Sequence, residues 1–217
     1  MGKGFQTLFF SILCLFSIQN YKSQKQNPFC GELVYQIERV DVKDSVKAEM
    51  IIYARDSLLR IVNFNFETGK QELIKHLRLG KSYLLIETPK QKFAIRTNEH
   101  LQKDSVQKYT FKKSFYFKRI AGLMARKVKV KQREIKNELS FYVYTKIAAK
   151  YANSFNRLPG LPVVYYSVTD HGLYKYSLKS IKKNEPPLQL FSIEKDFKIV
   201  TIEEFSKEFS KLYESGE

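Results

Sequence analysis

The chain has 217 residues, of which 43% are hydrophobic and 28% charged, with only 9 glycines and 6 prolines. This length suits one domain, and the composition excludes a disordered, collagen-like or low-complexity chain. The formal net charge is +16. In a cytosolic protein such a charge would indicate nucleic-acid binding. In an exported protein it indicates anionic lipid headgroups, acidic polysaccharide or another acidic surface.

The N-terminal segment differs in character from the rest of the chain. Lys3 is followed by an apolar run over 5–18 and then by a polar stretch, which is the pattern of a secretory signal peptide. The run is shorter than the ~20 residues that a membrane-spanning helix needs. We therefore expect a signal peptide over 1–23, cleaved somewhere in 19–23. A buried N-terminal strand or helix is the alternative.

The expected mature chain consists of a linker over 24–30 and one domain over 31–217, without an integral membrane span. Loss of Lys3 and Lys22 lowers the net charge from +16 to +14. A protein of this kind is exported, so nucleic acid is not an expected partner. Lipid or an acidic envelope surface is the expected partner class, and the pattern leaves the oligomeric state open.

Two cysteines are present, and neither fits a lipid-anchor site. A lipobox has a small residue before the cysteine, whereas Leu13 precedes Cys14 and Phe29 precedes Cys30. Cleavage of the signal peptide leaves Cys30 alone, so no internal disulfide is expected. Cys30 is interpreted as a small apolar residue near the first strand, with a reactive or intermolecular thiol as the alternative.

The first half of the domain reads as a series of strands. Leu33, Tyr35 and Ile37 alternate with more polar residues, the period of a half-buried strand. Extended runs rich in β-branched and aromatic residues follow at intervals. A turn is expected at 67–70, where Gly69 is free to take positive φ, and another at 88–91. The expected strands cover 31–40, 48–57, 58–66, 71–79, 81–87 and 92–97.

The second half continues this pattern after a polar stretch over 97–113, expected to be a loop with a helical turn. Val128 and Val130 alternate with Lys127, Lys129 and Lys131, so one face of this strand is buried and the other is wet and cationic. Residues 138–147 are its expected hairpin partner. No βαβ alternation appears, and closely spaced strands with polar turns favour a large antiparallel sheet.

The C-terminal segment shows a helical pattern instead. Apolar residues lie on one helical face, and Thr201 with Glu204 forms a capping box. Val200 and Phe205 occupy the positions of a hydrophobic staple. We expect this helix to pack on the sheet, with a helix lying on a membrane surface as the alternative. The face consists of Ile202, Phe205, Phe209 and Leu212.

The stretch RLPGLPVVYYSVTDHGLYKYSLKSI, residues 157–181, contains the most distinctive pattern. Pro159 and Gly160 fit the central positions of a type II turn, where glycine accepts positive φ, and a strand follows from Pro162. The TDHG tetrapeptide then has the turn residues of a hairpin. His171 is therefore interpreted as a residue of the hairpin tip, not as a catalytic base, because no nucleophile can be placed beside it by spacing.

At these residues the chain resembles the GLPGLI proteins, a family exported by Gram-negative bacteria. Leu158, Pro159, Gly160 and Leu161 match the family core, while Arg157 and Pro162 replace its first glycine and its isoleucine. The resemblance implies a protein of the periplasm or outer membrane. It also implies a fold similar to the lipoprotein-carrier (LolA-like) domains, a curved antiparallel half-barrel closed by helices. Together with the strand pattern, this gives the expected fold class: mainly β (α+β), a large curved antiparallel sheet or half-barrel with a C-terminal amphipathic helix.

The sequence carries no motif for a metal, a cofactor or a known reaction. His76, His100 and His171 lie in separate segments, without ligand spacing. Glu203 and Glu204 fit the first turn of a helix, where the dipole favours negative charge. We therefore expect no cofactor and a non-enzymatic protein, although glycosidase carboxylates need no motif and an unrecognised hydrolase stays open as the third alternative.

The first functional hypothesis is an apolar ligand or lipid held in the curved sheet. The strands carry many aromatic side chains, and a ligand cavity is mostly apolar. The alternative is that these side chains are ordinary core, with Phe205 and Phe209 of the helix filling the concavity. The second hypothesis is docking to an acidic envelope surface through Lys127, Lys129 and Lys131. The ligand-facing residues of the first hypothesis are Phe64, Phe66, Phe93, Phe115, Phe117, Phe141 and Tyr174.

Overall fold

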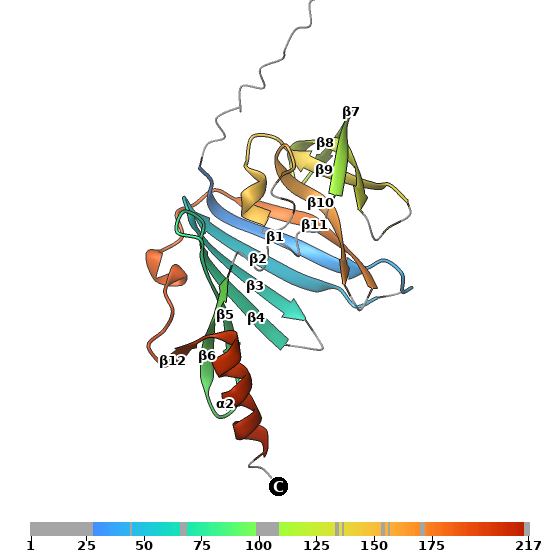
Figure 1. Ribbon diagram of the computed structural model, residues 1–217. Coiled ribbons are helices and arrows are strands. Elements are labelled where there is room, and N and C mark those ends of the chain that lie inside the picture. The colour runs from blue at the N-terminus through green and yellow to red at the C-terminus, as the bar shows by residue number, and fades with distance from the viewer. Residues whose placement is uncertain are drawn as a thin grey trace, which may run out of the picture.

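The computed structural model describes residues 28–43, 45–65, 69–98, 109–132, 135, 137–152, 155, 157–169 and 172–214. These residues form one curved sheet with a C-terminal helix beside it (Figure 1). The strands are β1 (Cys30–Arg39), β2 (Ala48–Arg55), β3 (Leu58–Asn65), β4 (Gly69–His76), β5 (Lys81–Glu87), β6 (Lys92–Asn98), β7 (Tyr109–Ile120), β8 (Leu123–Gln132), β9 (Leu139–Tyr144), β10 (Leu161–Thr169), β11 (Gly172–Lys182) and β12 (Phe197–Val200). The helices are η1 (Ala149–Ala152), η2 (Leu188–Phe191) and α2 (Ile202–Glu214).

The sheet has 12 strands in the order β12-β6-β5-β4-β3-β2-β1-β11-β10-β9-β8-β7. Strands β1 to β6 form one antiparallel meander and β7 to β11 form another. The pairing of β1 with β11 joins the two. Strands β12 and β7 are the two edges, so the sheet is open. The predicted fold class, mainly β with a C-terminal helix, is confirmed.

The period-two alternation places one face of the sheet against the main core. Leu33 and Tyr35 of β1 are fully buried, as are Ile52 of β2 and Leu59 of β3. They join residues from β8 to β11 and from η1 in a single hydrophobic cluster. Because strands distant in the sheet share this cluster, the sheet curves around it. We call this side the inner face and the opposite side the outer face.

The C-terminal segment 183–200 runs along the outer face as a strap. Arg55 binds the Pro186 carbonyl oxygen at 3.0 Å, and Arg60 binds that of Leu190 at 2.9 Å. The strap ends in β12, which pairs with β6 in parallel. This pairing covers the edge of the first meander, an edge that would otherwise expose unpaired backbone groups.

The helix α2 begins as predicted. The Thr201 amide donates to Glu204 Oε2 at 2.7 Å, and the Glu204 amide donates to Thr201 Oγ1 at 3.2 Å, which confirms the capping box. Phe205 meets Phe93 edge to face at 5.2 Å between ring centroids, within a cluster that includes Val200. The helix therefore lies at the β6 end of the sheet and leaves the main concavity to other residues (Figure 1).

The stretch around TDHG is a hairpin. Strands β10 and β11 pair antiparallel up to Thr169 and Gly172, and Gly172 has a φ of 126°. The hairpin prediction is confirmed, while Asp170 and His171 lie outside the described residues.

Gly160 is required for a different reason from the one predicted. It is not among the described glycines with positive φ, so the type II turn assignment is wrong. A Cβ at this position would lie 2.4 Å from the Tyr144 carbonyl oxygen and 2.7 Å from Thr145 Cα. The backbone entering β10 passes so close to the end of β9 that only glycine fits.

We expect Gly160→Ala to lower the free energy of unfolding by about 1–3 kcal/mol, the usual cost of overpacking a rigid contact. The atoms it meets belong to the backbone, so β10 must shift away from β9. Urea unfolding monitored by circular dichroism measures the change. A midpoint equal to that of the wild type would show that the two segments are not in this close contact.

Several local predictions need correction. Residues 109–113 belong to β7 and not to a loop, and Gly69 begins β4 instead of lying in a turn. The turn at 88–91 is confirmed by hydrogen bonds between Thr88 and Gln91. The segments 1–27 and 99–108, with the expected signal peptide and His100, lie outside the described residues. Within the described part of the chain, no helix has the length and apolar character needed to cross a bilayer.

Candidate functional site

A pocket of about 210 Å³ lies on the inner face, between the meander β2–β5 and the hairpin β10–β11. The wall from β2 to β5 is apolar at one end and carries amide groups at the other, and the wall from β10 and β11 carries hydroxyl groups. The first wall changes character because neighbouring inner-face positions on β3 and β4 change from apolar to amide toward one end of the strands. The apolar lining residues are Met50, Ile61, Leu73, Leu84 and Ala152, and the polar lining residues are Asn63, Gln71, Glu72, Tyr165, Ser167 and Tyr176.

Three tyrosines are packed together beside the pocket. Tyr165 stacks on Tyr176 with ring centroids 4.5 Å apart and 7° between the planes, and it meets Tyr35 edge to face at 5.9 Å. The Tyr35 hydroxyl donates to the Pro162 carbonyl oxygen at 2.9 Å. Burial raises the pKa of each of these phenols above its ordinary value. They therefore stay neutral at physiological pH and present hydroxyl groups, not charges.

Asn63 supplies an acceptor on the other side of the pocket. Its Oδ1 atom is buried and has no hydrogen-bond partner among the described residues. Asn63 pairs across the sheet with Gln71 and with Met50, which also line the pocket. A buried carbonyl oxygen without a partner costs about 1–3 kcal/mol. A bound molecule that donates a hydrogen bond here would remove that cost.

The aromatic residues predicted to face a ligand do not form one surface. Phe141 is fully buried in the main core, Tyr174 packs against that core, and Phe93 lies under α2. Phe64 is 42% exposed on β3, and Phe115 and Phe117 are 92% and 49% exposed on β7. None of these six lines the inner-face pocket, and Phe66 lies outside the described residues.

The sequence analysis missed the residues that line this pocket. They come from four of the first five strands, β2 to β5, and from the β10–β11 hairpin, which are far apart in the chain. Period-two alternation shows that two strand residues share a side but does not say which side faces the concavity. The predicted ligand-facing residues and the residues of this pocket are therefore different sets.

The lysines predicted for docking lie as expected on β8. Val128 and Val130 are fully buried, while Lys129 and Lys131 are exposed and Lys127 is half-buried. Lys129 Nζ is 3.7 Å from Glu138 Oε2, a long surface ion pair that contributes little. The cationic face of this strand is therefore present at the surface.

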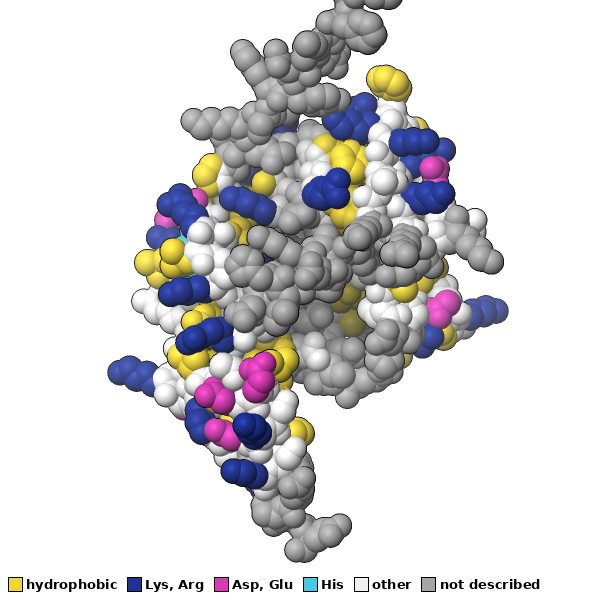
Figure 2. Space-filling model, viewed as in Figure 1, with side chains coloured by type: hydrophobic (Ala, Val, Ile, Leu, Met, Phe, Trp, Pro, Cys, Tyr) yellow, Lys and Arg dark blue, Asp and Glu magenta, His cyan; other side chains and the backbone are white. Residues whose placement is uncertain are grey.

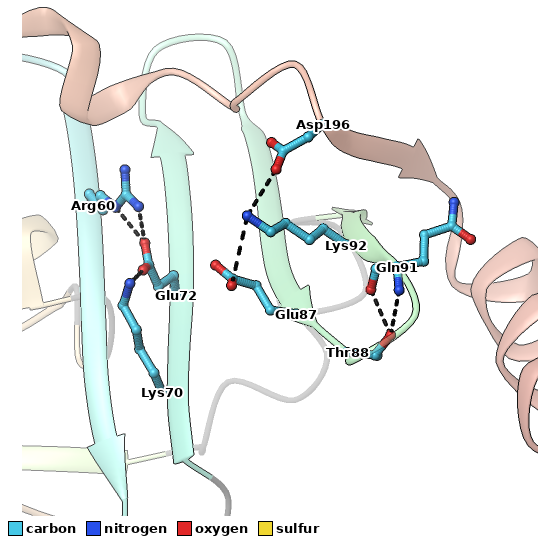
Figure 3. A network of polar contacts seen from close by, with 8 residues as sticks. All are labelled: Arg60, Lys70, Glu72, Glu87, Thr88, Gln91, Lys92 and Asp196. Atoms are coloured by element: carbon cyan, nitrogen blue, oxygen red, sulfur yellow. Dashed lines mark hydrogen bonds and ion pairs between the residues drawn. The ribbon is translucent and has the colours of Figure 1, made fainter.

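The carboxylate of Glu72, the most buried charged side chain among the described residues, lies on the outer face and has a structural role. Glu72 binds both Arg60 and Lys70, and Arg60 also holds the strap (Figure 3). Nearby, Lys92 Nζ contacts Asp196 of the strap at 2.9 Å and Glu87 at 3.9 Å. These carboxylates are neutralised by cations and hold segments together, which differs from the arrangement of a catalytic acid and base.

Cys30 lines a second pocket of about 390 Å³, together with Phe29, Tyr144 and Lys183. It is half-buried and forms no disulfide among the described residues. This pocket adjoins residue 28, where the described chain begins, and we assign it no role. Among the described residues, no group of three or more His, Cys, Asp or Glu side chains is placed to hold a metal ion.

Comparison with known proteins identifies a similar fold and no family. No family model matches the chain, and no curated protein matches it. A solved structure of PNGF-II in a C2 space group is similar with a TM-score of 0.50 and 12% identity, over 84% of this chain and 32% of that one. The chain thus spans about a third of the length of PNGF-II, and at this identity the similarity shows a shared fold alone.

Proposed function

We propose that this is an exported, non-enzymatic protein of the bacterial envelope that binds a small amphipathic molecule in the inner-face pocket. One observation carries the proposal: Tyr165, Ser167 and Tyr176 lie across a pocket of about 210 Å³ from the β2–β5 wall, which combines apolar side chains with the unpartnered acceptor Asn63 Oδ1. A small-molecule pocket combines apolar lining with placed polar groups, and here both kinds of lining are present in about equal measure.

The volume decides what kind of molecule fits. A cavity of about 150 Å³ holds benzene, whereas pockets for drug-sized ligands span about 300–1,000 Å³. The inner-face pocket, at about 210 Å³, suits a molecule of one or two rings. A long acyl chain does not fit within it, so the ligand class narrows from a lipid tail to a compact neutral molecule with a hydrogen-bond donor.

The proposal includes export and a relation to the GLPGLI proteins, and both are supported by the sequence alone. The apolar run after Lys3 supports a signal peptide, and Leu158, Pro159, Gly160 and Leu161 support the likeness to GLPGLI proteins. A periplasmic or outer-membrane location follows from both. Intact mass of the protein recovered from the periplasm tests the export step, since an uncleaved N-terminus would contradict it.

Ligand binding is tested with phenol and indole as probes, using saturation-transfer NMR. We expect both probes to bind wild-type protein, and Ser167→Phe to abolish the signal because the ring fills the pocket. Ser177→Phe is the matched control. It is a half-buried serine on the neighbouring strand β11, paired with Val164 and Gln36 on the outer face, and it should leave binding unchanged.

A second variant tests the role of the acceptor. Asn63→Leu has a similar shape without the carbonyl oxygen, so phenol should bind about tenfold more weakly, the loss of roughly one hydrogen bond. Toluene, which has no donor, should bind the variant at least as well as the wild type. Phenol binding that survives both Ser167→Phe and Asn63→Leu would place the probe elsewhere and refute the proposal.

A further inference from the structure

The hairpin of β7 and β8 presents apolar side chains to solvent at the free edge of the sheet. Phe115 is 92% exposed, Tyr116 55%, Phe117 49% and Met124 55%. Scattered apolar residues on a surface are normal, but a contiguous group marks an interaction site. β7 is an edge strand, and no described strand pairs with its free edge, so this group lies at an end of the sheet.

A bulge in β7 aims these side chains outward. Lys113 pairs with Val128 and Phe117 with Arg126, so the three residues Ser114, Phe115 and Tyr116 lie opposite one residue of β8. Arg126 Nε donates to the Ser114 carbonyl oxygen at 2.6 Å, which holds the bulge in place. A bulge bends its strand and redirects a side chain, and here that side chain is Phe115.

Arg126 also holds the rings. Its guanidinium carbon lies 5.6 Å from the Phe115 ring centroid and 5.8 Å from that of Phe117. Tyr116 meets Tyr142 of β9 edge to face at 6.5 Å. We call Phe115, Tyr116 and Phe117 the aromatic tip. Arg126 of β8 holds the backbone of the bulge, and Tyr142 of β9 contacts Tyr116, whereas the Phe115 ring stays in solvent.

The charge within the β7–β8 hairpin has a single sign, and Glu138 beside Lys129 is an acidic neighbour. Residues 109–132 contain no Asp or Glu, so the hairpin is wholly cationic. Figure 2 shows that basic side chains outnumber acidic ones at the end of the molecule formed by β7 and β8, with hydrophobic side chains among them. The cations are Lys112, Lys113, Lys118, Arg119, Arg126, Lys127, Lys129 and Lys131.

We propose that this hairpin docks the protein on an anionic lipid bilayer, with Phe115, Tyr116 and Phe117 entering the headgroup region. Aromatic side chains favour that depth. Each Lys or Arg near an anionic surface strengthens binding by about fivefold. The proposal is independent of the inner-face pocket, since none of these residues lines it.

The same features bear on the other candidate occupants. A second copy could add a strand along β7 only if the edge were regular, and the bulge with its flanking lysines prevents such pairing. A single-stranded nucleic acid stacks its bases on open aromatic faces and is the competing occupant, which the comparison with a single-stranded oligonucleotide below distinguishes. Charge and exposed rings together fit the lipid interface.

The chain has no tryptophan, which allows a direct test. Phe115→Trp places one fluorophore at the tip, and Leu79→Trp places one at another exposed site, 61% exposed in the wild type. With vesicles of phosphatidylglycerol and phosphatidylethanolamine, Phe115→Trp should shift its emission to the blue. Leu79→Trp should keep its emission unchanged, and phosphatidylcholine vesicles should affect neither.

Sedimentation with the same vesicles measures the energetics without a label. Phe115→Ser should weaken partitioning about tenfold, because one ring no longer leaves water. Raised salt should weaken it further, as the screening length falls from about 10 Å at 0.1 M to about 3 Å at 1 M. Phe115 and Leu79 are both exposed positions, and circular dichroism checks that each variant is folded.

Two outcomes would overturn the proposal. One is the absence of binding to anionic vesicles at low salt. The other is a result in which wild type and Phe115→Ser bind anionic vesicles equally well and both also bind a soluble polyanion, such as dextran sulfate or a single-stranded oligonucleotide, with similar affinity. The second outcome would show a charge-driven surface without insertion. A failure of phenol to bind the inner-face pocket would leave this proposal untouched.

Discussion

Replacing Arg60 with methionine is expected to lower the free energy of unfolding by about 3–5 kcal/mol. The Glu72 side chain is 6% exposed and that of Arg60 is 13% exposed, and Arg60 Nε donates to Glu72 Oε2 at 2.5 Å. Without Arg60, the buried carboxylate keeps only Lys70, whose side chain is 50% exposed. An uncompensated charge in the interior is the main cost.

The loss should also loosen the strap. Arg60 Nη1 donates to the Leu190 carbonyl oxygen, so limited proteolysis within 183–196 should become faster in Arg60→Met. Arg78→Met is the matched control. Arg78 pairs with Asp56 at 3.1 Å, with side chains 74% and 48% exposed, and an exposed pair contributes about 0–1 kcal/mol.

The double variant Arg60→Met/Glu72→Leu separates the ion pair from packing. Replacing both partners of a buried pair with apolar residues is often neutral, so the double variant should recover most of the stability lost in Arg60→Met. Urea unfolding at neutral pH measures all four proteins. A double variant as unstable as the single one would show that packing of the Arg60 side chain, and not the stranded charge, is responsible.

A steep loss of stability above pH 10 is the second large expected effect. Burial raises the pKa of Tyr35, Tyr165 and Tyr176 above the ordinary value of 10.0, and the neighbouring phenols raise that of Tyr165 further. The unfolded chain releases these protons near pH 10 while the folded chain retains them. The stabilisation is therefore complete below pH 10 and declines as the pH rises toward the folded values.

The slope can be stated in advance. Each proton that the folded chain retains and the unfolded chain has released lowers the free energy of unfolding by about 1.4 kcal/mol per pH unit. The three tyrosines together therefore give a slope of at most about 4 kcal/mol per pH unit, which applies while all three stay protonated in the folded chain. Urea unfolding at a series of pH values measures the slope, and tyrosinate absorbance reports ionisation. Ionisation of the buried phenols should coincide with unfolding.

Conservative variants identify the groups responsible. Tyr165→Phe should reduce the loss of unfolding free energy per pH unit above pH 10 by about a third. The triple variant Tyr35→Phe/Tyr165→Phe/Tyr176→Phe should remove most of this pH dependence. Tyr35→Phe also loses the hydrogen bond to Pro162, so its stability at neutral pH serves as the reference for its own slope. An unchanged slope in the triple variant would mean that these phenols are not the buried acids.

Local features of this protein could be predicted from the sequence because they depend on neighbours along the chain. The alternation around Tyr35 and around Val128 requires only the period of a strand, and both strands are observed. The capping box of Thr201 and Glu204 lies within one helical turn. The hairpin ending at Thr169 and Gly172 follows from turn chemistry over a few residues.

Other features depend on contacts between segments that are distant in sequence. The pairing of β1 with β11 and of β11 with β10 places Tyr176 and Tyr165 on the side of the concavity, whereas the register of β3 and the bulge of β7 leave Phe64 and Phe115 in solvent. The passage of the chain beside Tyr144 makes Gly160 necessary. Because a strand's alternation is the same whichever face is buried, no pattern in the sequence distinguishes the residues of the inner-face pocket, of the core and of the exposed tip. Their assignment required the curvature and register of the complete sheet.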